Sequence, residues 1–328
     1  MLAQRNSYSA VEYNIELNRS RLESKKEILK HAAPETTGLS PKKTQYEQRR
    51  KGSHANILED ERNDFGNRER LKYVVDYAKQ IFTHMKNTEE KYLAQPNYIT
   101  LNQKDINPKM RAILIDWLID VHNKFKMRPE TLFLTVNLID RYLELVTITR
   151  QKLQLVGVAC LLIAAKYEEI YPPRVKDLVY VTDSAFKREE ILDMEGKILA
   201  ALKFRLTAPS SYEFYQRFVQ LAQIGENAAF IGCYLLELAL VDYKMMKYTA
   251  RMLACGAVYA AKASEGKTEW SDVLARNSEY DETAVKACAE ELAQLMVPSQ
   301  DKIVLTAAKR KYSQSKYDGV ANTVLKKF

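Results

Sequence analysis

The chain has 328 residues, which is long enough for two domains. Hydrophobic residues make up 46% of it and charged residues 28%, as in ordinary globular proteins, and the few glycines and prolines favour helices over a turn-rich sheet. The net charge of +8 is spread out, with no basic run interleaved with aromatic residues, so we expect no nucleic-acid partner. No apolar run reaches the roughly 20 residues that cross a bilayer, and no signal peptide is visible, so we expect a soluble intracellular protein without membrane contact.

The residues that usually carry catalysis or bind metals are scattered. The sequence lacks a Ser/His/Asp set, a glycine-rich phosphate loop and a cluster of metal ligands. The cysteines lie far apart in helix-like segments without Cys-x-x-Cys spacing, which predicts buried, reduced thiols rather than disulfides or zinc ligands. They are Cys160, Cys233, Cys255 and Cys288. We therefore expect no catalytic residue, no metal and no cofactor.

Residues 1–64 are polar and lack sustained periodicity, which predicts a disordered regulatory tail. Within the tail, Ser40-Pro41-Lys42-Lys43 fits the Ser-Pro-x-Lys pattern of proline-directed kinases. A tetrapeptide of this kind also arises by chance in a polar segment, so a phosphosite at Ser40 and a chance match both stay open. The cluster at 49–51 is either a weak nuclear import signal or a solvated group of charges.

An amphipathic helix is predicted over 70–86, within an N-terminal helix-and-linker segment at 65–107. The next helix, over 109–126, carries apolar residues on two adjoining faces. Met110, Ile113, Leu114, Trp117 and Val121 share one face, and Ile115, Leu118, Ile119 and Phe125 share the other. One face is enough to join a core, so the helix is either buried on both sides or offers one side to a partner.

The most apolar stretch runs from Leu153 to Ala165 and has no polar face, which predicts a helix in the middle of a larger core. After it the sequence changes abruptly to Lys166-Tyr167-Glu168-Glu169, and Pro172-Pro173 prevents the helix from continuing. The helix would therefore deliver a cation, an aromatic ring and two acids to one edge of the core. We expect function at that edge.

Two sets of helices follow one another, and no segment alternates as a strand would. The expected helices are 109–126, 130–146, 150–168, 174–181 and 184–202 in the first set, and 210–223, 226–243, 247–263, 269–276, 281–297 and 299–312 in the second. The stretches LVGVACLLIAAK and MLACGAVYAAK end at Lys166 and Lys262, 96 residues apart. An all-α fold with an internal duplication explains this pattern.

Several long motifs resemble those of the mitotic cyclins, and of B-type more than A-type members. They are MRAILIDWL at 110–118, TVNLIDRYL at 135–143, KLQLVG at 152–157, KYEEIYPP at 166–173, VTD at 181–183, Met194-Glu195 and Lys311-Tyr312. The resemblance covers about 70–315. It implies two tandem five-helix cyclin boxes, at 108–206 and 207–312, with a C-terminal tail at 313–328.

The resemblance also implies a function. In the family, the chain is the non-catalytic, activating subunit of a cyclin-dependent Ser/Thr protein kinase, controls G2/M and mitosis in the nucleus and cytoplasm, and recruits substrates. A cyclin-fold transcription factor and a helical scaffold without a kinase stay open as alternatives. Such transcription factors often carry an N-terminal zinc ribbon, and this tail contains no cysteine.

The resemblance assigns two groups of site residues. Those expected to contact the kinase are Lys166, Glu195, Tyr167, Phe204 and Ile163, and by a looser match Tyr73, Asp76 and Tyr77. Those expected to capture Arg-x-Leu-type motifs of substrates or inhibitors are Met110, Ile113, Leu114, Trp117, Asp120, Arg150 and Gln154. Without the resemblance, Lys166 and Glu195 would form a structural ion pair and Trp117 would be a core residue.

The sequence departs from the family pattern at three places. Arg174 stands where an acid is frequent after the double proline, and Gly196 follows Glu195 where a larger residue is usual. Arg19 to Leu22 forms only a minimal Arg-x-x-Leu, so recognition of the tail by ubiquitin ligase machinery is expected from the family and weakly marked in the residues.

Overall fold

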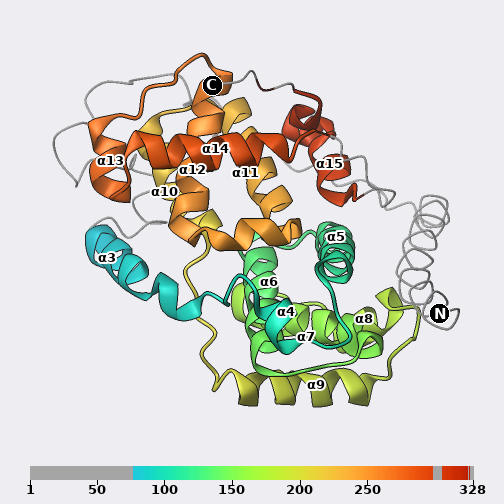
Figure 1. The fold of residues 1–328 in the computed structure, drawn as a ribbon. Coiled ribbons are helices and arrows are strands. Elements are labelled where there is room, and N and C mark those ends of the chain that lie inside the picture. Colours follow the sequence, from blue (N-terminus) through green and yellow to red (C-terminus); the bar gives the residue numbers. More distant parts are fainter. Residues whose placement is uncertain (1–76, 298–304, 324, 326–328) are drawn as a thin grey trace, which may run out of the picture.

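The structure is a computed structural model that describes residues 77–297, 305–323 and 325. Within these ranges the chain forms helices and no strand, which confirms the predicted all-α fold. Two helical bundles lie one above the other, and the N-terminal helix α3 (Ala78–Thr88) runs along their side (Figure 1).

The first bundle contains the five helices that the sequence predicted between Asn107 and Arg205. They are α5 (Pro108–Lys124), α6 (Pro129–Leu145), α7 (Arg150–Glu168), α8 (Val175–Val181) and α9 (Arg188–Ala201). Proline opens both α5 and α6, at a position where the missing N–H would have no partner inside the helix. The side chain of Asn107 caps α5 by accepting a hydrogen bond from the Met110 N–H at 2.9 Å.

Helix α7 is the axis of this bundle. Every residue from Leu153 to Ala165 is buried, and the helix packs against α6 and α9. Gly157 allows α5 to come close, because a Cβ at this position would lie 2.8 Å from a methyl carbon of Leu114. The helix ends at Glu168, before Pro172 and Pro173. The prediction of a buried central helix is confirmed.

The second bundle repeats this plan around α12. Its helices are α10 (Ser211–Ala222), α11 (Glu226–Val241), α12 (Ala250–Ser264), α13 (Asp272–Ser278) and α14 (Glu282–Gln294). Helix α12 packs against α10, α11 and α14, and residues 254–262 are all buried. Gly256 allows α14 to come close to α12, because a Cβ at this position would lie 2.8 Å from the Cys288 sulfur.

Helix α5 lies between the two bundles and is buried on both sides. Met110, Leu114 and Trp117 belong to the core of the first bundle. Ile115 and Ile119 belong to the core of the second. Of the two interpretations that the sequence left open for this helix, the structure therefore supports burial of both faces.

A buried ion pair ties the two bundles together near α5. The Arg111 guanidinium donates to both carboxylate oxygens of Asp140, at 2.6 and 2.7 Å, and also to the Leu240 carbonyl at 3.0 Å. The Tyr98 hydroxyl donates to the same carboxylate at 2.9 Å. Tyr98 belongs to α4 (Tyr98–Asn102), a short helix in the segment that was predicted to be a linker. A single turn of helix is too short to produce a recognisable period.

Two predicted helix starts differ most from the structure. Helix α9 begins at Arg188 rather than after Ser184, because Asp183 and Ser184 adopt left-handed conformations with φ of 56° and 60°. The carboxylate of Glu190 instead accepts from the Lys187 N–H at 2.8 Å and caps the helix there. The last helix, α15, spans only Ala307–Tyr312, and the preceding residues 298–304 lie outside the described part of the chain.

The segments at both ends of the described chain are anchored by charged side chains. Glu89, buried after α3, accepts from the Arg251 side chain at 2.9 Å, and burial raises its pKa against the opposing effect of that arginine. At the other end, Lys311 of α15 donates to buried Glu237. Both contacts attach terminal segments to the second bundle.

Candidate functional site

The predicted edge of the first bundle contains an ion pair between two helices. Lys166, in the last turn of α7, donates through Nζ to both carboxylate oxygens of Glu195 in α9, at 2.6 and 2.8 Å. The Lys166 side chain is 47% exposed and that of Glu195 is 13% exposed. The Glu195 carboxylate therefore positions the Lys166 ammonium group, while the lysine side chain stays about half exposed to solvent.

Two aromatic residues that were predicted to contact the kinase lie at the surface. Phe204 is 71% exposed, and Tyr167 is about half exposed, with its hydroxyl within hydrogen-bond distance of the Thr207 hydroxyl. Phe204 follows α9 with a left-handed φ of 56°, directly after Lys203 at 52°. Left-handed conformation costs a residue with a side chain roughly 1 kcal/mol or more. Phe204 thus combines an exposed apolar ring with an unfavourable backbone conformation.

The loop after α7 adds two apolar side chains that were not among the predicted site residues. Ile170 is 86% exposed and Tyr171 is 92% exposed, just before the double proline. Their position after a helix end was visible in the sequence, but their exposure was not. Ile163, which was expected to contact the kinase, is instead buried in the core below this edge.

The acids that follow Tyr167 connect α7 to the start of α6. Glu169 Oε1 accepts from the Arg128 N–H at 2.7 Å and from the Thr131 hydroxyl at 2.6 Å. The pKa of Glu168 is raised by burial and by the neighbouring carboxylates of Glu213 and Glu130. Glu169 thus holds the end of α7 against the start of α6.

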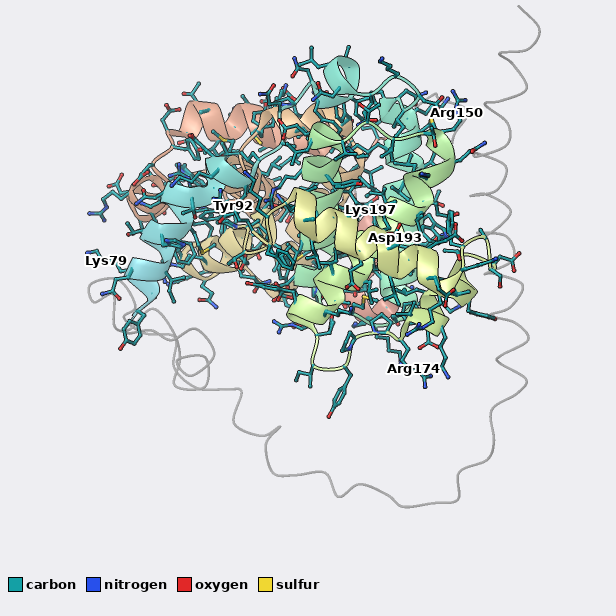
Figure 2. The ribbon with its side chains drawn as sticks, turned by 90° about the horizontal axis from the view of Figure 1, so that it is seen from below. Lys79, Tyr92, Arg150, Arg174, Asp193 and Lys197 are labelled. Atoms are coloured by element: carbon teal, nitrogen blue, oxygen red, sulfur yellow. The ribbon has the colours of Figure 1, made fainter. Side chains whose placement is uncertain are left out.

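Two of the three departures from the family pattern, Arg174 and Gly196, lie near this edge. The side chain of Arg174 is largely exposed and points away from the ribbon, and its Nε donates to Asp177 at 3.1 Å at the start of α8 (Figure 2). Gly196 has no atom within 4 Å of the place a Cβ would occupy. A larger residue at position 196 would therefore fit, and packing does not require glycine there.

Other predicted site residues lie apart from this edge or outside the described ranges. Tyr77 is exposed at the start of α3. Tyr73, Asp76 and the tail with Ser40 fall outside the described residues, so their roles stay predictions.

The residues of the expected substrate-docking patch meet between α5 and α7, but mostly below the surface. Met110, Ile113, Leu114, Trp117 and Gln154 are all buried. The Trp117 Nε1 and Gln154 Nε2 groups have no hydrogen-bond acceptor in the described part of the chain. A buried donor without an acceptor is unfavourable.

The two charged residues of this patch are already engaged within the chain. Arg150 donates through Nε to Asp105 Oδ1 at 2.7 Å. Asp120 accepts a hydrogen bond from Arg310 of α15. No sequence pattern indicates the Arg310 contact, because the two residues are 190 positions apart.

The cysteine thiols lie outside these two surfaces. All four thiols are free, and burial raises the pKa of Cys233 and of Cys288 to about 12, so both are protonated at neutral pH. Among the described residues, no three His, Cys, Asp or Glu side chains gather as a metal site requires. Nor does any helix in those ranges combine the length and apolar character needed to span a bilayer.

Comparisons with known proteins agree with this architecture. The cyclin N-terminal domain model matches residues 80–207, and the cyclin C-terminal domain model matches residues 209–325. A viral cyclin from herpesvirus saimiri has the same fold, with a TM-score of 0.59 over 66% of this chain and 97% of its own, at 21% identity.

Plant cyclins are closer in sequence. G2/mitotic-specific cyclin-1 of Medicago sativa subsp. varia is 42% identical over 76% of this chain, and Cyclin-B2-2 of Arabidopsis thaliana is 42% identical over 75%. Cyclin-A1-1 of Oryza sativa subsp. japonica is 40% identical over 74%. The matches cover 58%, 57% and 49% of these relatives, so the chain spans about half of their length. With both domain models matched in order over two helical bundles, this chain belongs to the cyclin family.

Proposed function

We propose that this chain is the activating, non-catalytic subunit of a cyclin-dependent Ser/Thr protein kinase that acts in G2 and mitosis. The observation that carries this proposal is the edge formed by Lys166, Glu195 and the exposed apolar side chains around them. The printed names of the relatives, G2/mitotic-specific cyclin-1 and Cyclin-B2-2, support the cell-cycle assignment.

The ion pair suits a binding role better than a purely structural one. A lysine ammonium has three N–H donors, and Glu195 accepts two of them. The third donor is aimed by this geometry and would reach a backbone carbonyl of a partner. Because about half of the lysine side chain is exposed, the pair itself adds little to folding stability.

The apolar side chains around the pair would supply most of the binding energy. Phe204, Ile170 and Tyr171 project into solvent, and large rings of this kind are frequent anchors at interfaces. A kinase is active only when the glutamate of its regulatory helix pairs with the phosphate-orienting lysine. A partner that binds only this arrangement shifts the kinase population toward it.

The decisive experiment is to purify the tagged full chain from dividing cells and identify any kinase that is retained. We expect a cyclin-dependent kinase, with phosphorylation of a generic peptide in the eluate. The Lys166→Ala variant should retain no kinase, and its eluate should not phosphorylate the peptide. Lys197→Ala is the matched control, because Lys197 pairs with Asp193 on the opposite side of α9 (Figure 2). Retention of a basal transcription factor, or of no kinase at all, would favour the alternative cyclin-fold functions.

We also propose that the patch between α5 and α7 recruits substrates or inhibitors with a short leucine-containing motif. The donors of Trp117 and Gln154 support this role, since an extended peptide would offer them carbonyl oxygens. Because the apolar patch residues are less than a tenth exposed, a peptide leucine would enter only after side chains such as Met110 turn outward. The test compares phosphorylation of a peptide carrying the motif with the same peptide without it.

The tail would supply regulation. We propose phosphorylation at Ser40, recognition by ubiquitin ligase machinery near Arg19 to Leu22, and residence in both nucleus and cytoplasm. Support comes from the sequence motifs and the family.

Imaging of a fluorescent fusion tests the location, and the half-life of a variant with Arg19→Ala and Leu22→Ala tests the degradation signal. An unchanged half-life would contradict the second proposal.

A further inference from the structure

Asp120 of α5 is held by an arginine from the other bundle. Arg310 of α15 donates through Nη2 to Asp120 Oδ2 and through Nη1 to the Thr306 hydroxyl at 2.7 Å. The side chain of Asp120 is only 13% exposed, whereas that of Arg310 is 38% exposed. The cation of this pair is therefore more exposed to solvent than the anion.

The contact is part of a larger attachment of α15 to α5, which lie close together (Figure 1). One turn before Asp120, the buried carboxylate of Asp116 accepts from the Ala307 N–H at 2.8 Å. This second bond positions the start of α15, and Arg310 follows one turn later. The guanidinium is thus placed on Asp120 by the packing of the two helices.

This arrangement changes what the docking patch can recognise. A patch reads a ligand arginine through a carboxylate that the ligand can reach. Here a ligand arginine would have to displace Arg310 from Asp120 and then lie next to a second guanidinium. Like charges placed side by side disfavour binding, and such repulsion is one way in which a site rejects a ligand.

The charged side chains around the patch carry a net positive charge. Lys109 is exposed beside Met110 at the start of α5. Arg150 is paired with Asp105, as Arg310 is paired with Asp120. These five side chains carry three positive and two negative charges, and each negative charge has an arginine partner within the chain.

We propose that Arg310 is a specificity-determining residue of the docking patch: it fills the position of a ligand arginine from within the chain. The patch then accepts an extended peptide whose anchoring leucine is preceded, two residues earlier, by an acidic residue rather than by arginine. This inference rests on the proposed docking function of the patch.

The experiment measures binding of three fluorescent peptides, identical except for Arg, Ala or Glu two residues before the leucine, to the full chain by anisotropy. For the unmodified chain we expect the Glu peptide to bind best and the Arg peptide to gain less than about twofold over Ala, within the spread of such pairs. Arg310→Gln should release Asp120, so that the Arg peptide binds about tenfold more tightly than the Ala peptide. Arg174→Gln, which breaks an exposed Arg–Asp pair outside the patch, is the matched control and should leave the Arg peptide without this gain.

Two further variants separate specificity from folding. Asp120→Asn should leave the Arg peptide no weaker and tighten the Glu peptide, because Arg310 loses its internal partner. Combining Asp120→Asn with Arg310→Gln should abolish the gain seen with Arg310→Gln alone.

A tenfold preference of the unmodified chain for the Arg peptide would overturn the inference and leave docking intact. The inference would also be overturned if the Arg310→Gln variant has a native melting curve and ranks the three peptides in the same order as the unmodified chain. If no peptide binds any variant, docking and the inference both fail, while kinase retention by the chain is judged separately.

Discussion

Replacing Lys166 by alanine separates a binding role from a structural one, because the two roles predict different magnitudes. The Lys166 side chain is 47% exposed, so loss of its bonds to Glu195 should lower the free energy of unfolding by less than about 1 kcal/mol. For a folded region of this size, such a change lowers the melting temperature by no more than about 4 °C. The fold should therefore survive the substitution.

The effect on kinase binding should be larger. In the complex the ammonium would be shielded from solvent and would donate to the partner, and truncating an interface anchor of this kind costs about 2 kcal/mol or more. That corresponds to about a thirtyfold rise in Kd. Titrating the purified variant into its kinase, with phosphorylation of a generic peptide as readout, measures this change.

Arg111 shows what the loss of a structural ion pair looks like in the same chain. Its pair with Asp140 is buried, and breaking a buried pair by removing one partner costs about 3–5 kcal/mol. Arg111→Ala should therefore lower the melting temperature by about 6–20 °C. If Lys166→Ala destabilises the chain as strongly as Arg111→Ala, or leaves the Kd for the kinase unchanged, the assignment of Lys166 to the interface is refuted.

Three further outcomes follow from the described contacts. Burial and nearby Lys311 lower the pKa of His122 to about 3, so between about pH 6.5 and pH 3 the imidazole is protonated in the unfolded chain but not in the folded one. The free energy of unfolding should therefore fall by about 2 kcal/mol between pH 7 and pH 5. Urea titrations at the two pH values measure this loss, and His122→Gln should reduce it. Phe204→Gly should raise the free energy of unfolding by up to about 1 kcal/mol by relieving the left-handed backbone, yet weaken kinase activation; a less stable variant would contradict this account. Gln154→Leu removes a buried donor without an acceptor, so the melting temperature should hold or rise while affinity for a docking peptide falls; unchanged affinity would exclude Gln154 from docking.

The sequence by itself was sufficient for the fold class and the central helix. Leu153 to Ala165 has no polar face, and such a segment can only be buried. The double proline predicted that α7 ends before residue 172, because proline cannot continue a helix. These are local properties of neighbouring residues, so they can be read without knowledge of the rest of the chain. The repeat of small residues in α12 could be read in the same way.

Contacts between distant residues had to come from the tertiary structure. Both faces of α5 were visibly apolar, but only the packing of the second bundle against Ile115 and Ile119 showed that neither face is free. Likewise, the exposure of Ile170 and Tyr171 depends on what the rest of the chain leaves uncovered. The pairing of Asp120 with Arg310 has no sequence signal at all, because helix packing selects a partner 190 residues away, whereas periodicity reports only on neighbours along one helix.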